Sequence, residues 1–526
     1  MSGPTPLGAR RRKKRAIRPP GAQTPVWLDQ GVGAVLLQAD WLLPISGPPI
    51  ANGAVAVEGT VIVAVGPAEE LRSRYPAEPV REFPGCALMP GLVNTHTHLK
   101  FSAFGGFAEP CGFGEWMLRL LLAARKLSDE DYGVSALWGA YECARSGVTS
   151  IADTCREGWM VARAAAAAGL RARIYLEVFG LDDAQLPAIM EGLEAGLERT
   201  RREAGAGAGG APMSGAPGDG GEHGPAVEAG VSPHAPYSVS ARLYRETARF
   251  ARREGLRLAT HVAESQAEVE LLTRGKSAIA TAYKTANLWT GQRWRPPHQR
   301  PLQYVAQTGA LGPETLVVHA VELDDDDIAA LAASEAVVAH CPRSNQRLQC
   351  GIAPVAEMMA AGVTVGLGTD SLASNDSLDM FAEMRAALAA SRARAAFGAR
   401  AGGRATASAS AEASPTAPLA LTPETVLRMA TLDGARAVGW DRLVGSLEPG
   451  KLADIIAVQL PGRAFDARRA DARALDPVSL LVATATADDV RMTTVEGNEI
   501  FGDCQSGVPA DVVAAFKAAR AKLGLP

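Results

Sequence analysis

The chain has 526 residues, a hydrophobic share of 47% and a formal net charge of −4. This composition supports a large core, excludes global disorder and gives no case for nucleic acid or a charged polymer as a partner. No apolar run approaches the roughly 20 residues that cross a bilayer, so we expect no membrane span. The seven cysteines form no C-x-x-C pair, which favours a reduced, cytoplasmic protein.

The N-terminus carries the basic run RRRKKR from Arg10 to Arg15. No apolar segment follows this run, which excludes a secretory signal. We therefore predict that residues 1–26 are a disordered, solvated tail. A tether to an anionic surface and a start codon placed too far upstream remain open alternatives.

Short Val-rich segments broken by glycine and proline lie near both ends of the chain, at 33–43, 53–66, 445–460 and 490–502. Such segments are typical of short strands. We expect residues 27–87 and 443–505 to meet in space as one small, discontinuous β-sandwich domain.

Between these ends, short apolar segments alternate with helical patterns such as 266–272 and 423–437. Eight segments read as strands, at 88–98, 149–153, 172–179, 228–234, 258–264, 315–321, 336–342 and 364–370. Alternating strands and helices predict a parallel sheet, and eight repeats predict its closure. The fold class is thus α/β, a distorted (β/α)8 TIM-type barrel over 88–442. Two low-complexity segments, 204–224 and 390–417, are expected to be flexible inserts.

Histidines and one aspartate cluster where these strands end, and in a barrel such ends share one mouth. His96 and His98 close the first strand as an H-x-H pair, whose side chains point to the same side. His261 ends the fifth strand and Asp370 the eighth. Three imidazoles and one carboxylate suit zinc, or ferrous iron as the alternative, with a position left for water.

Several motifs carry a resemblance to a known family: PGLVNTHTHLKFS, SPHAPYSVS, THVAES, HCPRSN, GTDSLASNDSLDMFAEMR and LEPGKLADIIA. Together they resemble the amidohydrolase superfamily. The subgroup is the one that holds S-adenosylhomocysteine/methylthioadenosine deaminases, aminodeoxyfutalosine deaminases and Atz/Trz triazine hydrolases. The resemblance runs from about residue 33 to 502, interrupted by the two inserts. It implies one divalent metal ion bound by His96, His98, His261 and Asp370.

The resemblance also implies roles for the neighbouring residues. Glu264 would be the proton shuttle, His319 would orient the attacking water, and His234 would contact substrate. The chemistry agrees, because metal binding can lower the pKa of water from 15.7 to about 7. Asp370 can accept the water proton, and Glu264 can pass a proton to a ring nitrogen and then to departing ammonia. Ser371, next to Asp370, is a further candidate substrate contact.

The roles of the other polar residues near the predicted strand ends stay open. We interpret His340 as a supporting or packing residue rather than a ligand, and His298 as a surface or lid residue. Glu177 either pairs within the core or reaches the substrate. Ser344 and Asn345 are candidates to shape the same mouth.

Three absences narrow the chemistry. Two-metal members of the superfamily usually carry a carboxylated lysine at the fourth strand end, but no lysine lies between 127 and 275, so one metal is expected. The GKS at 275–277 lacks the first glycine of a P-loop, since Glu270 stands there. The H-x-E and P-C-x-x-C signature of cytidine-type deaminases is missing.

The substrate prediction depends on the GFGEWM region, where Phe113 and Trp116 either stack on a flat heterocycle or pack their helix. This region, RIYLEVFGL and RPLQYVAQTGAL are most similar to aminodeoxyfutalosine deaminases of menaquinone biosynthesis. We therefore expect a hydrolytic deaminase of an adenine-type nucleoside that releases ammonia after attack by metal-activated hydroxide. Alternatives are methylthioadenosine or adenosylhomocysteine deamination, triazine dechlorination, guanine deamination, and a catalytically silent scaffold. Family resemblance favours a homodimer.

Overall fold

The computed structural model describes residues 34–107, 110–207, 227–289, 295–402, 420–461, 476–502 and 507–526. The predicted basic tail and most of both predicted inserts lie outside these ranges. Within them, no helix combines the length and apolar character that a membrane crossing requires.

The central element is a ring of eight parallel strands. In chain order these are β5 (Leu92–Thr97), β6 (Val148–Cys155), β7 (Arg171–Val178), β8 (Val227–Pro233), β9 (Leu258–Val262), β10 (Thr315–His319), β11 (Val337–His340) and β12 (Val365–Leu367). Each strand pairs with its neighbour in sequence. Asp370 N donates to His96 O at 2.9 Å, and Asn94 Nδ2 to Thr369 Oγ1 at 2.8 Å, which joins the last strand to the first. The predicted (β/α)8 barrel is confirmed.

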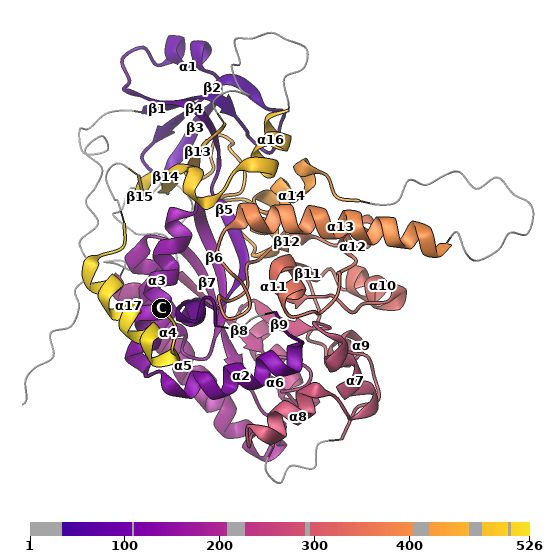
Figure 1. The fold of residues 1–526 in the computed structure, drawn as a ribbon. Helices are drawn as coiled ribbons and strands as arrows, with labels where there is room; N and C mark the ends of the chain where they lie inside the picture. Colours follow the sequence, from indigo (N-terminus) through magenta and orange to yellow (C-terminus); the bar gives the residue numbers. More distant parts are fainter. Residues whose placement is uncertain are drawn as a thin grey trace, which may run out of the picture.

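Helices cover the outside of this ring (Figure 1). They include α3 (Asp129–Arg145), α4 (Gly158–Ala168), α5 (Leu186–Gly207), α6 (Ala241–Arg253), α10 (Asp325–Ala333) and α13 (Met380–Gly402). Every residue of β5, β6, β9 and β10 is buried, because the barrel interior lies on one face and the helices on the other. The predicted helical stretch 423–437 forms α14 (Pro423–Met429) and α15 (Leu432–Ala437).

Strands from the two ends of the chain form a second sheet, at the top of Figure 1. Its order is β15 (Asn498–Phe501), β14 (Val490–Val495), β13 (Ile455–Gln459), β4 (Val80–Pro90), β1 (Val35–Leu42), β2 (Ile50–Glu58) and β3 (Val61–Pro67). The expected sandwich is therefore one hydrogen-bonded sheet, antiparallel except between β1 and β4. Its two halves share one core, in which Val55 and Ile62 pack with Ile455 and Met492.

Two helical features differ from the sequence expectation. Residues 390–402, expected to be a flexible insert, continue α13, and 204–207 continue α5. These segments are rich in alanine, which favours a helix over a loop. A C-terminal helix, α17 (Ala510–Leu523), was not expected. It packs on α3, where the rings of Phe516 and Trp138 stack at 4.2 Å.

Candidate active site

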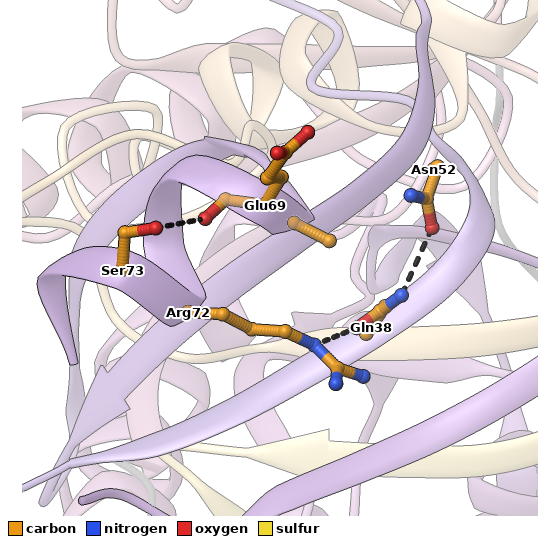
Figure 2. A pocket seen from close by; sticks show the side chains of 6 residues that line it. Gln38, Asn52, Glu69, Arg72 and Ser73 are labelled. Carbon is orange, nitrogen blue, oxygen red and sulfur yellow. Dashed lines mark hydrogen bonds between the residues drawn. The ribbon is translucent and has the colours of Figure 1, made fainter. Parts of the chain in front are cut away.

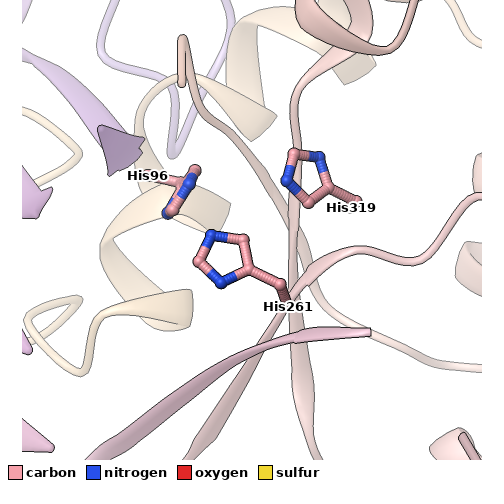
Figure 3. A group of neighbouring side chains, drawn as sticks. All are labelled: His96, His261 and His319. Carbon is pink, nitrogen blue, oxygen red and sulfur yellow. The ribbon is translucent and has the colours of Figure 1, made fainter. Parts of the chain in front are cut away.

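The histidines and the aspartate of the predicted cluster come together at the C-terminal mouth of the barrel. His96 lies in β5, His261 in β9 and His319 at the end of β10, while His98 directly follows β5 and Asp370 lies three residues after the end of β12. His96, His261, His319 and Asp370 are each at most 5% exposed. Figure 3 shows the rings of His96, His261 and His319 turned toward a shared centre.

Short distances between these side chains define the cluster. The ring centroid of His96 lies 4.7 Å from that of His98, 4.9 Å from that of His261 and 5.7 Å from that of His319. One Asp370 oxygen, Oδ1, lies 3.6 Å from Nε2 of both His96 and His98. Donor atoms from different strands thus meet around a single point.

Contacts behind the rings orient them. The Nδ1 atom of His98 lies 2.6 Å from Thr154 O, and that of His261 lies 3.0 Å from His234 O. A carbonyl oxygen can only accept, so each Nδ1 carries the proton and each Nε2 keeps its lone pair. Such carbonyl contacts are typical behind metal-binding imidazoles.

The carboxylate of Asp370 is held from several sides. Its Oδ2 accepts from Ser344 Oγ at 2.6 Å and Ser374 Oγ at 3.0 Å, and its Oδ1 accepts from Ser371 N at 2.7 Å. Burial raises its pKa, but the neighbouring imidazoles of His96, His98 and His319 outweigh burial and keep it well below its usual range. Asp370 is therefore ionised.

Backbone strain is concentrated at this mouth. His319 has φ +74°, Asp370 has φ +58° and Ala263, one residue before Glu264, has φ +55°. Residues with a Cβ rarely adopt this left-handed region, and when they do they cluster at active and ligand-binding sites.

The donor set fits a divalent metal ion. Both ring nitrogens of His96 are buried without a hydrogen-bond partner among the described residues. Donor atoms of His96, His98 and Asp370 lie within 4.8 Å of one another, as do those of His96, His261 and His319. The imidazoles of His98 and His319 are neutral and able to bind, because burial lowers the pKa of His98 to about 3 and that of His319 to about 4.

Glu264 lies on one side of the cluster, with His319 and Asp370. Its Oε1 is 3.5 Å from His319 Nε2, and donor atoms of all three residues lie within 4.8 Å of one another. Burial, together with the charges of Asp370 and Glu268, raises the pKa of Glu264 well above its usual value. A raised pKa suits this carboxyl group to proton transfer. His319 is oriented by Asn345, whose Oδ1 lies 3.0 Å from Nδ1.

His234 and Glu177 lie on another side, at the ends of β8 and β7. Their donor atoms and one of His261 are within 4.8 Å of one another. His234 Nδ1 is 2.7 Å from Ser238 Oγ, and its ring stacks on Phe179 at 4.5 Å. Burial raises the pKa of Glu177 to about 7.

Phe113, Trp116 and Ser371 are also predicted to contact the substrate, and they are linked to the mouth through neighbouring residues. Phe113 and Trp116 lie on α2 (Phe113–Ala123), with ring centroids 5.6 Å apart. Phe113 is 5% exposed and packs in an apolar cluster with Tyr237, which supports the packing interpretation. Trp116 Nε1 donates to Ala373 O at 2.8 Å, and Ser371 lies against Asp370.

The remaining candidates lie apart from the cluster centre. His298 is exposed and its Nδ1 bonds Thr273 O at 3.0 Å, which places it at the surface. His340 ends β11 and is buried. A separate hollow lies on the terminal sheet and α1 (Ala68–Arg74), where Gln38 bonds Asn52 at 2.9 Å and Arg72 bonds Gln38 at 2.8 Å (Figure 2). Its polar side chains already bond one another.

Sequence reasoning missed several residues that support the site. Thr154 O and Ser374 Oγ contact His98 and Asp370, and Glu268 Oε2 accepts from Glu264 N at 2.8 Å. Lys100 forms a 2.8 Å ion pair with Glu157 beside His98. The strand-end rule could have found Thr154, because it directly follows the predicted strand 149–153.

Comparison with known proteins agrees with this geometry. Residues 87–500 match the model of the Amidohydrolase family. A 5-methylthioadenosine/S-adenosylhomocysteine deaminase from Syntrophobacter fumaroxidans is 32% identical over 86% of this chain and 88% of its own. A 5'-deoxyadenosine deaminase from Methanothermobacter thermautotrophicus is also 32% identical, over 87% of this chain and 93% of its own.

Solved structures show the same fold. A zinc-bound adenosine deaminase from Xanthomonas campestris has a TM-score of 0.75 at 24% identity, and covers 94% of this chain and 99% of its own. An aminofutalosine deaminase from Helicobacter pylori has a TM-score of 0.67 at 20% identity, and covers 89% of this chain and all (100%) of its own. The family match over most of the chain and the 32% identical relatives agree with the barrel and its mouth: this chain belongs to the amidohydrolase family, whose members generally use a divalent metal ion.

Proposed function

We propose that the protein is a hydrolytic deaminase of an adenine-type nucleoside. The observation that carries this proposal is the buried carboxyl group of Glu264, 3.5 Å from His319 and close to Asp370, next to the unpartnered ring nitrogens of His96. Relatives 32% identical over most of their length are named as deaminases of 5-methylthioadenosine and S-adenosylhomocysteine and of 5'-deoxyadenosine. Aminodeoxyfutalosine belongs to the same chemical class and stays in the candidate set.

In this proposal, His96, His98, His261 and Asp370 hold one divalent ion, with zinc as the expected metal. Such an ion, when bound, acidifies water and so supplies a nucleophile at neutral pH. His319 is the alternative imidazole ligand, because its donor atom and those of His96 and His261 lie within 4.8 Å of one another.

The protein's own groups move the protons. Asp370 is ionised and can take the proton of the attacking water. Glu264 can donate a proton to the ring nitrogen beside the reacting carbon. His319 Nε2 lies 3.5 Å from Glu264 Oε1, where it can hold the developing oxygen. A carbon–oxygen bond forms, and Glu264, ionised once it has protonated the ring nitrogen, takes the proton of the new hydroxyl group and gives it to the amino group. The carbon–nitrogen bond then breaks and ammonia leaves, and the proton held by Asp370 passes to Glu264, which restores both groups.

Ammonia release by the purified, metal-analysed protein tests the proposal. The panel holds methylthioadenosine, adenosylhomocysteine, 5'-deoxyadenosine, adenosine, aminodeoxyfutalosine, guanine and a chlorotriazine. We expect release from adenine nucleosides and none from guanine. Chloride release from the triazine, or no ammonia from any nucleoside by metal-loaded protein, would contradict the deaminase.

A further inference from the structure

Glu177 is a half-buried carboxylate that has no role in the catalytic steps above. It is the penultimate residue of β7, and its Oε1 has no hydrogen-bond partner among the described residues. Its nearest polar neighbours at the mouth are His234 and His261, with donor atoms within 4.8 Å.

The charged groups around Glu177 already have other contacts. Lys100 pairs with Glu157 at 2.8 Å, and the guanidinium of Arg156 lies over the ring of Phe179 at 5.7 Å. Phe179 in turn stacks on His234. These residues form one wall of the mouth, which we call the β6–β8 wall: Lys100, Arg156, Glu157, Glu177, Phe179 and His234. The Glu177 carboxylate within this wall keeps an oxygen free for a ligand.

The two mouth carboxyl groups face different parts of a bound nucleoside. Glu264 sits with His319 and Asp370, from β10 and β12, where the amino group leaves. Glu177 sits with His234, from β7 and β8, away from that edge. The remainder of the substrate must therefore pass along the β6–β8 wall.

The chemistry of an adenine nucleoside then restricts what Glu177 can bind. The ionised form of Glu177, which predominates above its pKa of about 7, only accepts hydrogen bonds. The ring nitrogens of adenine are also acceptors, and its amino group is engaged beside Glu264. The remaining donors are the sugar hydroxyls. Resting on the deaminase function proposed above, we propose that Glu177 accepts a hydrogen bond from a ribose hydroxyl and so selects ribonucleosides over deoxyribonucleosides and free bases.

Paired substrates and variants test this role. Ammonia release is measured for a ribonucleoside and for its 2'-deoxy and 3'-deoxy analogues, with wild type, Glu177→Ala and Glu177→Gln. The wild type should lose about 10- to 100-fold in kcat/KM when the bound hydroxyl is removed, as expected for a hydrogen bond to a charged group. In Glu177→Ala the parent substrate should lose a similar factor, and the deoxy analogue should then be turned over as fast as the parent. Glu177→Gln keeps an acceptor oxygen and should give an intermediate ratio.

Glu198→Gln is the control, because Glu198 is 74% exposed and pairs with Arg202 on α5, outside the β6–β8 wall. This variant should keep the wild-type ratio between parent and deoxy analogue. Metal content and the circular dichroism spectrum show whether each variant is folded. A ratio in Glu177→Ala equal to that of the wild type would overturn the role of Glu177 alone. Failure of the wild type to release ammonia from any nucleoside would overturn the deaminase function itself, and this inference with it.

Discussion

Strand β7 carries a charged side chain at each end, and the two ends differ. At its start, Arg171 Nη2 donates to Asp454 Oδ1 at 3.3 Å and to Glu496 Oε1 at 2.9 Å, both on the terminal sheet. Near its other end, Glu177 Oε1 has no partner within the described residues. The first end uses charge to join the barrel to the sheet, and the second leaves acceptor atoms open. In a barrel this is the expected division, with stability at the N-terminal face and chemistry at the C-terminal face.

The largest effect should come from Asp370→Ala. This change removes both a proposed ligand and the proton acceptor, so turnover should fall by at least about 10⁴-fold, the scale seen when a central catalytic group is removed. Asp376→Ala is the control, because Asp376 is 63% exposed and pairs with Arg343 at the surface. Steady-state ammonia release measures both. Normal kcat in Asp370→Ala would remove this residue from the mechanism.

Glu264→Gln should act on the rate but not on the metal. The amide cannot exchange a proton, so kcat should fall by about 10²–10⁴-fold while metal content stays at the wild-type level. Kinetics and elemental analysis on one preparation measure both quantities. A raised KM with unchanged kcat would mean that Glu264 only binds substrate.

At the opposite end of β7, Arg171→Leu should affect stability and leave chemistry intact. It leaves Asp454 and Glu496 buried without their cation, which costs about 3–5 kcal/mol of unfolding free energy. Arg119→Ala is the control, since the pair of Arg119 with Glu115 is an exposed i,i+4 contact worth about 0.3–0.5 kcal/mol. Denaturant unfolding measures both. An equal loss in the two variants would contradict a structural role for the Arg171 cluster.

His340→Asn should change the pH dependence of stability. Burial lowers the pKa of His340 to about 3, below its value of about 6.5 in the unfolded chain. The unfolded state therefore binds the proton first, so the stability that this histidine contributes is complete above about pH 6.5 and falls by about 1.4 kcal/mol per pH unit toward the folded pKa. Metal-free His340→Asn should lose stability less steeply than metal-free wild type between about pH 6 and 4. Parallel stability curves for the two proteins would show that the folded state protonates His340 as readily as the unfolded state does.

The catalytic mouth was largely predictable because its residues follow a local rule. His96, His98, His261 and Asp370 each end an apolar run, and parallel closure brings such ends together. The eight barrel strands were predictable for the same reason, since each is a short apolar segment between helical patterns.

The remaining features depend on contacts between distant segments. Ser374 reaches Asp370, and Arg171 reaches Glu496, only because the barrel closes and the terminal sheet docks beneath it. No local pattern distinguishes these side chains from surface residues. The free oxygen of Glu177 likewise becomes apparent only once Lys100 is seen to pair with Glu157.

Metal content per chain tests the proposed metal centre at the barrel mouth most directly, with a variant at the N-terminal end of β7 as the control. Wild type, Arg171→Leu and Asp370→Ala would be stripped with a chelator, reloaded with zinc, desalted and analysed by elemental mass spectrometry. We expect about one ion per chain in wild type and in folded Arg171→Leu, and much less in Asp370→Ala, since zinc sites of this type use about four donors. A wild type without bound metal, or an Asp370→Ala variant that retains a full ion, would contradict the proposed metal centre at the mouth.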